Sequence, residues 1–253
     1  MKVDHSVMRV PVLCALVVGC ALGVAVLSRV SPGRADCALP REALVLLTPA
    51  GARIPPGAGL AAMVGSTFYA GRGGPTPRLT GAGGEFELRR VPIAPGIERL
   101  EPVGAGPGRY FVDGLGTGPR VEIEIAAAPT PPHLPAPRPR AAAYRELEFD
   151  RHAGQRSELS VDLGAPVPGG AVAIIGRWAA SGQGGVGAVR AGERVVIAYR
   201  SADGCDRTPP QVGSPRVGTS ATFAFVDALG RPGAWSTPVT ISAASPRQPH
   251  EDP

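Results

Sequence analysis

The hexapeptide FVDGLG at Phe111–Gly116 recurs as FVDALG at Phe225–Gly230, 114 positions later along the chain. Each copy ends an aromatic, apolar stretch, passes through a glycine-containing turn and precedes a last strand-like run, VEIEI at Val121–Ile125 and STPVTIS at Ser236–Ser242. Aspartate suits such a turn because its carboxylate accepts hydrogen bonds from backbone amides two residues on, and glycine supplies a positive φ. The repeat therefore predicts two copies of one structural unit, each closed by this hairpin.

The segments upstream of each copy indicate short β-strands separated by Gly- and Pro-rich turns. VEIEI is the clearest, because Val121, Ile123 and Ile125 lie on one face of a strand and the two glutamates on the other. No segment shows a sustained period of 3.6 with helix caps, so the pattern predicts an all-β sandwich or barrel. The other expected strands are Ala43–Leu47, Leu60–Tyr69, Glu85–Val91, Ile97–Val103, Arg109–Gly114, Tyr144–Asp150, Ser157–Leu163, Ala171–Trp178, Val186–Val189, Glu193–Arg200 and Thr219–Asp227.

Changes in composition divide the chain into five regions. Six prolines fall within residues 126–143, and they favour an extended, semi-rigid spacer because proline interrupts both helices and sheet ladders. Each flanking half has about the length of one immunoglobulin-sized sandwich. The expected regions are an N-terminal signal or membrane anchor at 1–35, a first sandwich at 37–125, the linker at 126–143, a second sandwich at 144–243 and a disordered tail at 244–253.

The turn from Asp227 to Gly230, with the Ser-containing stretch after it, resembles the last hairpin of fibronectin type III and bacterial immunoglobulin-like domains. In those domains an Asp-x-x-Gly turn precedes the closing strand. The resemblance covers about twenty residues at the end of each half, and the first copy lacks the Ser-rich stretch. It implies two tandem immunoglobulin/fibronectin-like β-sandwiches, which are most often spacers or binding modules without catalytic residues.

The N-terminus has the pattern of a secretory signal peptide. Lys2 and Arg9 precede an uncharged apolar run at residues 10–28, and small residues then lead to a cleavage site between Ala35 and Asp36. Two alternatives remain: residues 10–28 are long enough for an uncleaved single-pass anchor, and VVGC ending at Cys20 resembles a lipobox. The apolar run continues past Cys20, which disfavours lipidation. All three place the rest of the chain in the periplasm, at the cell surface or outside the cell.

Outside this segment the chain has two cysteines, Cys37 and Cys205. In an oxidising compartment an even pair indicates a disulfide, which would tie the start of the first sandwich to a loop of the second. Two free thiols, or a bridge from Cys37 to another chain, are the alternatives.

The charged and polar residues indicate no recognised chemistry. The first 35 residues hold four of the 26 basic and one of the 21 acidic residues, so the remainder is nearly neutral and nucleic acid is not an expected partner. No zinc-type His/Cys motif occurs, and neither a metal nor another cofactor is expected. GQGGVG at Gly182–Gly187 fits a dinucleotide-binding pattern, but its flanks leave no room for the helix, which makes it a flexible hairpin loop.

The sequence thus predicts a non-enzymatic envelope or extracellular interaction or spacer module. Its expected partner is a protein or a surface polymer, and it meets the membrane only through a retained N-terminal segment. Trp235 is the candidate for an exposed binding surface, since aromatic residues dominate binding hot spots, whereas Trp178 is expected in the core. The alternatives are a secreted or periplasmic hydrolase that recruits His152, and a metal-handling β-sandwich protein in which Cys37 or Cys205 meets a histidine.

Overall fold

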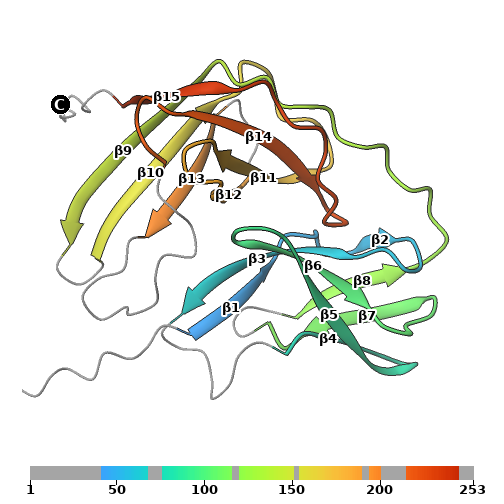
Figure 1. Cartoon of the computed structure of the whole chain (residues 1–253). Helices are drawn as coiled ribbons and strands as arrows, with labels where there is room; N and C mark the ends of the chain where they lie inside the picture. The colour runs from blue at the N-terminus through green and yellow to red at the C-terminus, as the bar shows by residue number, and fades with distance from the viewer. Residues whose placement is uncertain are drawn as a thin grey trace, which may run out of the picture. The chain divides into compact units, whose positions relative to one another are not determined.

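The computed structural model describes residues 41–67, 76–115, 120–150, 154–189, 194–200 and 215–244. Within them, all regular secondary structure is β-strand, and no helix suitable for crossing a membrane occurs in these ranges. The all-β prediction is therefore confirmed, and the strands group into an eight-stranded and a seven-stranded sheet (Figure 1). The cleavage site Ala35–Asp36, the apolar run 10–28, Cys37, Cys205 and His152 lie outside the described residues.

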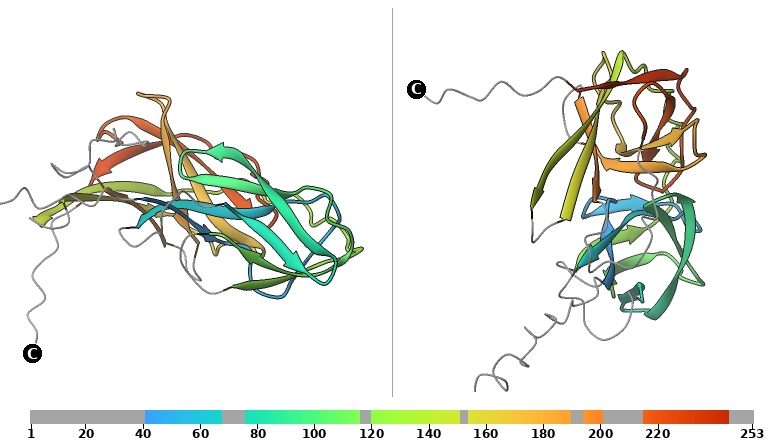
Figure 2. Two further views of the ribbon diagram at one scale, coloured as in Figure 1. Left: turned by 90° about the horizontal axis from the view of Figure 1, so that it is seen from below. Right: turned by 60° about the vertical axis from the view of Figure 1, so that its left-hand side comes forward.

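The eight strands of the first sheet follow the order β1-β3-β6-β5-β4-β7-β8-β2. In chain order their bounds are β1 Arg41–Leu46, β2 Ala52–Ile54, β3 Leu60–Thr67, β4 Arg78–Gly81, β5 Gly84–Ala94, β6 Ile97–Pro102, β7 Gly108–Asp113 and β8 Val121–Ile125. The long strand β5 pairs with β4 through its first residues and with β6 through its later ones, so it joins the two halves of the sheet. β1-β3-β6-β5 and β4-β7-β8 then have the strand order of the two leaves of an immunoglobulin sandwich. Figure 2 shows these strands, in blue to green, curling around a common interior.

The seven strands of the second sheet follow the order β12-β11-β14-β15-β9-β10-β13. Their bounds are β9 Ala141–Asp150, β10 Gly154–Asp162, β11 Ala171–Trp178, β12 Gly184–Ala188, β13 Arg194–Arg200, β14 Ser220–Asp227 and β15 Val239–Ala243. The last strand pairs in parallel with an early strand in both sheets, β8 with β2 and β15 with β9. Each sheet thus contains one parallel pair that joins its last strand to an early one. We call the unit formed by β1–β8 the first sandwich and the unit formed by β9–β15 the second sandwich.

Two strands were not expected from the sequence. β2 lies between the expected strands Ala43–Leu47 and Leu60–Tyr69, and β4 lies between Leu60–Tyr69 and Glu85–Val91. Both are short, and β2 is held by parallel pairing to β8, far along the chain. The glycine-rich loop at Gly182–Gly187 also differs from expectation, because from Gly184 onward it forms β12.

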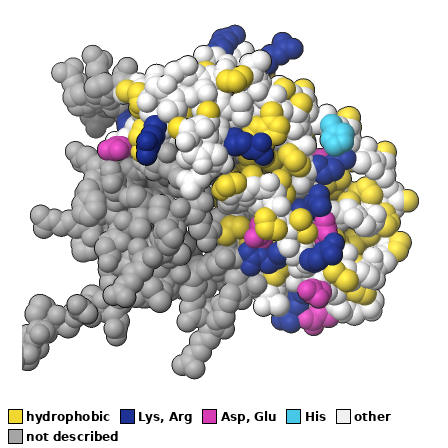
Figure 3. All heavy atoms as spheres, in the orientation of Figure 1, with side chains coloured by type: hydrophobic (Ala, Val, Ile, Leu, Met, Phe, Trp, Pro, Cys, Tyr) yellow, Lys and Arg dark blue, Asp and Glu magenta, His cyan; other side chains and the backbone are white. Residues whose placement is uncertain are grey.

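Each sandwich has a separate apolar core. In the second, Trp178 is almost completely buried, as its position at the end of β11 predicts, and its ring meets Phe223 edge-on with centroids 6.3 Å apart. In the first, Leu44, Leu60 and Leu100 are inaccessible to solvent. On the face seen in Figure 3, basic and acidic side chains are interspersed with apolar ones.

The two copies of the hexapeptide adopt different backbone conformations. In FVDGLG, Gly114 has φ +74°, and a Cβ there would lie 2.0 Å from the carbonyl oxygen of Thr76. In FVDALG the positive φ falls two residues later, on Gly230 with φ +70°, and Ala228 has an ordinary backbone. The first copy leads into the regular β7–β8 hairpin. After the second copy, β14 and β15 pair only at Ser220 and Ala221, far from the turn.

Candidate functional site

Strands β11 and β14 are buried on both faces. Their inward residues Ile174, Phe223 and Phe225 belong to the core of the second sandwich. The alternate residues form a separate apolar cluster on the outer face of the same strands, and all of them are at most 1% exposed. These outer residues are Ala173, Ile175, Ala224 and Val226.

The first sandwich covers this outer face with the hairpin between β5 and β6. Ile97 is fully buried in the same cluster, and Ile93, Ala94 and Leu47 pack against it. A Cβ on Gly96, at the hairpin tip, would come within 2.7 Å of the Val186 side chain on β12. We call this cluster the joint, and it comprises the outer residues of β11 and β14 on one side and Ile97, Ile93, Ala94 and Leu47 on the other. It lies within the single compact unit Leu39–Pro253.

The turn of the second hexapeptide makes the polar contacts of the joint. The Ala228 carbonyl accepts hydrogen bonds from the Thr48 hydroxyl at 2.7 Å and from the Ala61 amide at 3.2 Å. Thr48 is itself buried, and its hydroxyl oxygen accepts from the same Ala61 amide at 2.9 Å. Leu229 is 5% exposed and belongs to the core of the first sandwich.

The shape of this turn is set by Asp227, which is buried. Its Oδ1 accepts hydrogen bonds from the backbone amides of Leu229 at 3.0 Å and Arg231 at 2.9 Å. Its Oδ2 accepts from the Arg231 guanidinium at 2.7 Å. A carboxylate that accepts this many hydrogen bonds fixes the local backbone, so Asp227 and Arg231 hold Ala228 and Leu229 in position to dock.

The proline-rich segment lies along the second sandwich for part of its length. The Pro131 carbonyl accepts a hydrogen bond from Arg231 at 2.8 Å, and Leu134 is buried in the second core. Gly233 packs against Leu134, where a Cβ would lie 2.5 Å from the Leu134 carbonyl oxygen. Ala141–Ala143, expected in the linker, are the first residues of β9. Because Arg231 contacts both the segment and the docking turn, the two are held together.

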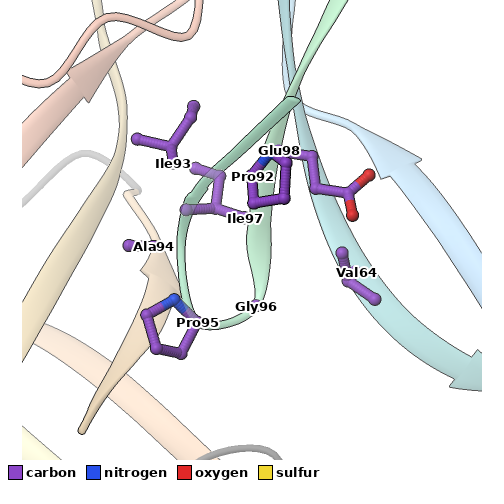
Figure 4. Close-up of a pocket in the computed structure, with 8 residues that line it drawn as sticks. All are labelled: Val64, Pro92, Ile93, Ala94, Pro95, Gly96, Ile97 and Glu98. Carbon is purple, nitrogen blue, oxygen red and sulfur yellow. The ribbon is translucent and has the colours of Figure 1, made fainter. Parts of the chain in front are cut away.

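Trp235 lies at the margin of the joint. Its side chain is partly buried against the joint cluster, and the Arg177 guanidinium stacks 4.4 Å from the centre of its ring. Its role as a binding surface remains a prediction, with one part of the ring already used in packing. A groove of about 320 Å³ lies beside the β5–β6 hairpin. Figure 4 shows its lining, with Val64 and Glu98 on the side away from Ile93. The groove is lined by Val64, Pro92, Ile93, Ala94, Pro95, Gly96, Ile97 and Glu98.

The first hexapeptide copy carries a charged cluster on the outer face of the first sandwich. Arg120 binds both Asp113 carboxylate oxygens at 2.7 Å, and the Thr80 hydroxyl donates to Asp113 at 2.9 Å. The hydrogen bonds from Arg120, with a smaller effect from Thr80, hold the pKa of Asp113 below its usual value. Arg120 also lies 4.9 Å from the ring centre of Phe111, which is partly exposed. The arrangement ties the end of β7 to the residue before β8 and keeps Asp113 ionised at neutral pH, which makes it a poor general acid.

We expect Asp113 to make the first sandwich sensitive to acid. Because its pKa is lower in the folded than in the unfolded state, its contribution to stability is present above about pH 4 and is lost as the pH falls through the folded pKa. Arg120→Met should raise the Asp113 pKa, and Asp113→Asn should remove this part of the acid sensitivity. NMR titration of the Asp113 carboxyl carbon tests the first effect, with Arg53→Met as an exposed control. An unchanged Asp113 pKa in Arg120→Met would contradict it.

Among the described residues, no three His, Cys, Asp or Glu side chains converge as metal ligands. Of the histidines, only His133 lies within the described residues, and it is exposed in the proline-rich segment. The Glu101 carboxylate bridges Arg89 and Arg99 on β5 and β6, and hydrogen bonds from Arg89 and then Arg99 lower its pKa.

The sequence interpretation missed the joint, although a signal for it was present. AVAIIG at Ala171–Gly176 and TFAFV at Thr222–Val226 are continuous apolar runs, unlike the alternating VEIEI. Continuous apolar runs are typical of strands buried on both faces. These runs indicate that the outer face of β11 and β14 is buried, but they do not indicate which residues bury it.

The sequence matches no protein-family model. It matches no curated protein either. Among solved structures, the chain is similar to one described as "Biofilm associated protein - BSP domain", with 14% sequence identity and a TM-score of 0.22. The similarity covers 82% of this chain and 30% of that one, so this chain spans less than a third of its length. At this TM-score we infer neither fold nor function from it.

Proposed function

We propose that this protein is an exported, non-catalytic module in which two immunoglobulin-like sandwiches act as one interaction or spacer unit. It would work in the cell envelope or outside the cell, with a protein or a surface polymer as its partner. The signal-like pattern of residues 1–35 supports export. The strand order of the first sandwich supports an immunoglobulin-type unit.

The observation that carries this proposal is the joint. Inter-domain contacts within a chain normally resemble transient interfaces, and relative motion of the domains is the default expectation. Here, strands β11 and β14 are instead covered on the outer face by Ile97 and its neighbours, and Leu229 enters the core of the other sandwich. A spacer or a binding module uses such an arrangement to present its surfaces at a constant separation.

Export and the processing of the N-terminus are tested by cell fractionation and by the intact mass of the purified protein. We expect the protein outside the cytoplasm with a mass that begins at Asp36. A further loss of two hydrogens would show that Cys37 and Cys205 pair. A full-length protein that remains in the cytoplasm would contradict the proposal.

The non-catalytic role is tested by pull-down from envelope extracts and by binding to isolated surface polymers. Trp235→Ala and Arg177→Ala should weaken binding if the partner meets the margin of the joint, with Val103→Ala on the first sandwich as an exposed control. Hydrolysis of a substrate that is abolished by a single substitution in the purified protein would favour the enzyme alternative.

A further inference from the structure

The joint is asymmetric in what each sandwich contributes. Among the described residues, the core cluster of the second sandwich is formed by residues between Leu134 and Ile241, all from its own half of the chain. The core of the first sandwich includes Leu229, which belongs to the other half. Among the described residues, the core cluster of the second sandwich thus draws on its own half alone, whereas that of the first takes one buried side chain from the second.

The polar contacts show the same asymmetry. The Thr48 hydroxyl and the Ala61 amide are donors buried in the first sandwich, and both use the Ala228 carbonyl of the second. Buried donors that lose their acceptor are costly. If the joint opens, water can replace the partners of the Ala228 carbonyl, because this carbonyl lies in a short turn. Thr48 and Ala61 then lose part of their hydrogen bonding, next to the space in the first core that Leu229 had filled.

Ile97 extends the argument to the β5–β6 hairpin. It is fully buried, and the other buried members of its cluster all come from the second sandwich. Without the second sandwich, Ile97, Ile93 and Leu47 would face water at the edge of the first. The outer residues of β11 and β14 would also be exposed, but the inner faces of these strands would still pack in the cluster of Ile174, Phe223 and Phe225.

We propose that the turn Asp227–Arg231 completes the first sandwich, so that the first sandwich becomes stable only after the second has folded and docked. Folding then runs against the order of synthesis, in which N-terminal domains generally fold first. The N-terminal half would stay loosely packed until the C-terminal half is available, a property compatible with passage through a membrane in an unfolded state. This inference is independent of the partner and of export, and it can fail while the proposed function holds.

The test is native-state hydrogen exchange on the purified, full exported chain. Strands β4 and β7 report on the first sandwich, and β9 and β10 on the second, because none of their residues with described side chains belongs to the joint cluster. Leu229→Ala should accelerate exchange in β4 and β7 by at least about tenfold, with β9 and β10 unchanged within about twofold. Leu229→Met, which conserves the side-chain volume, should leave the exchange rates of both sandwiches close to those of the natural chain.

Two core variants test the direction of the dependence. Leu44→Ala, in the first core, should accelerate exchange in β4 and β7 alone. Phe223→Leu, in the second core, should accelerate exchange in all four strands, since the first sandwich depends on the second. Equal acceleration of both sandwiches by Leu229→Ala, no acceleration in either, or full protection of β7 in Phe223→Leu would each overturn the proposal.

Discussion

Replacing Trp178 by alanine is expected to lower the free energy of unfolding of the second sandwich by about 3–5 kcal/mol, the range for a large buried aromatic side chain. Trp178 is 1% exposed and packs edge-on against Phe223. Gly176 leaves room for its ring, since a Cβ at Gly176 would lie 2.7 Å from the indole. The indole therefore fills a space that its neighbours cannot close after truncation.

Chemical denaturation followed by circular dichroism measures this loss. Trp178→Phe should cost less, because it keeps most of the apolar volume. Trp235→Ala is the matched control: Trp235 is only partly buried, at the margin of the joint, and should cost less than Trp178→Ala. An equal loss in Trp178→Ala and Trp235→Ala would contradict the assignment of Trp178 to the core.

Ile175→Asp is expected to open the joint without unfolding the second sandwich. Ile175 is 1% exposed and faces the joint, so an aspartate there would place an unpaired carboxylate among apolar side chains, at a cost of several kcal/mol. Separation of the two sandwiches brings the carboxylate into water and relieves this cost. Small-angle scattering should then show a larger radius of gyration, and β10 should keep its protection from exchange.

The neighbouring residue provides the matched control. Ile174 is buried to the same degree but faces the core of the second sandwich, where no rearrangement of domains can expose it. Ile174→Asp should therefore unfold the second sandwich, and Ile175→Val should change the stability by only about 0.5–1.5 kcal/mol. A compact scattering profile for Ile175→Asp, or unfolding equal to that of Ile174→Asp, would show that the joint does not separate.

The sequence by itself determined that the chain is all-β and where most of its strands lie, except for β2 and β4. Alternation in VEIEI and the apolar runs of β11 and β14 are local properties, since side chains point to opposite faces of a strand with a period of two. The turn chemistry of FVDGLG is local as well, because the positive φ of Gly114 requires a residue without a Cβ. For these reasons, most strands of both sandwiches could be placed from composition and spacing.

Only the tertiary structure decided what the second hexapeptide does. The first of the two nearly identical hexapeptides lies at the end of β7, which pairs with β8, whereas Ala228 and Leu229 of the second dock into the other sandwich. It also decided the parallel pairing of the short strand β2 with β8, and the cover over the outer face of β11 and β14. Periodicity shows that a face is apolar, but the surface that buries it is set by contacts between residues far apart in the chain.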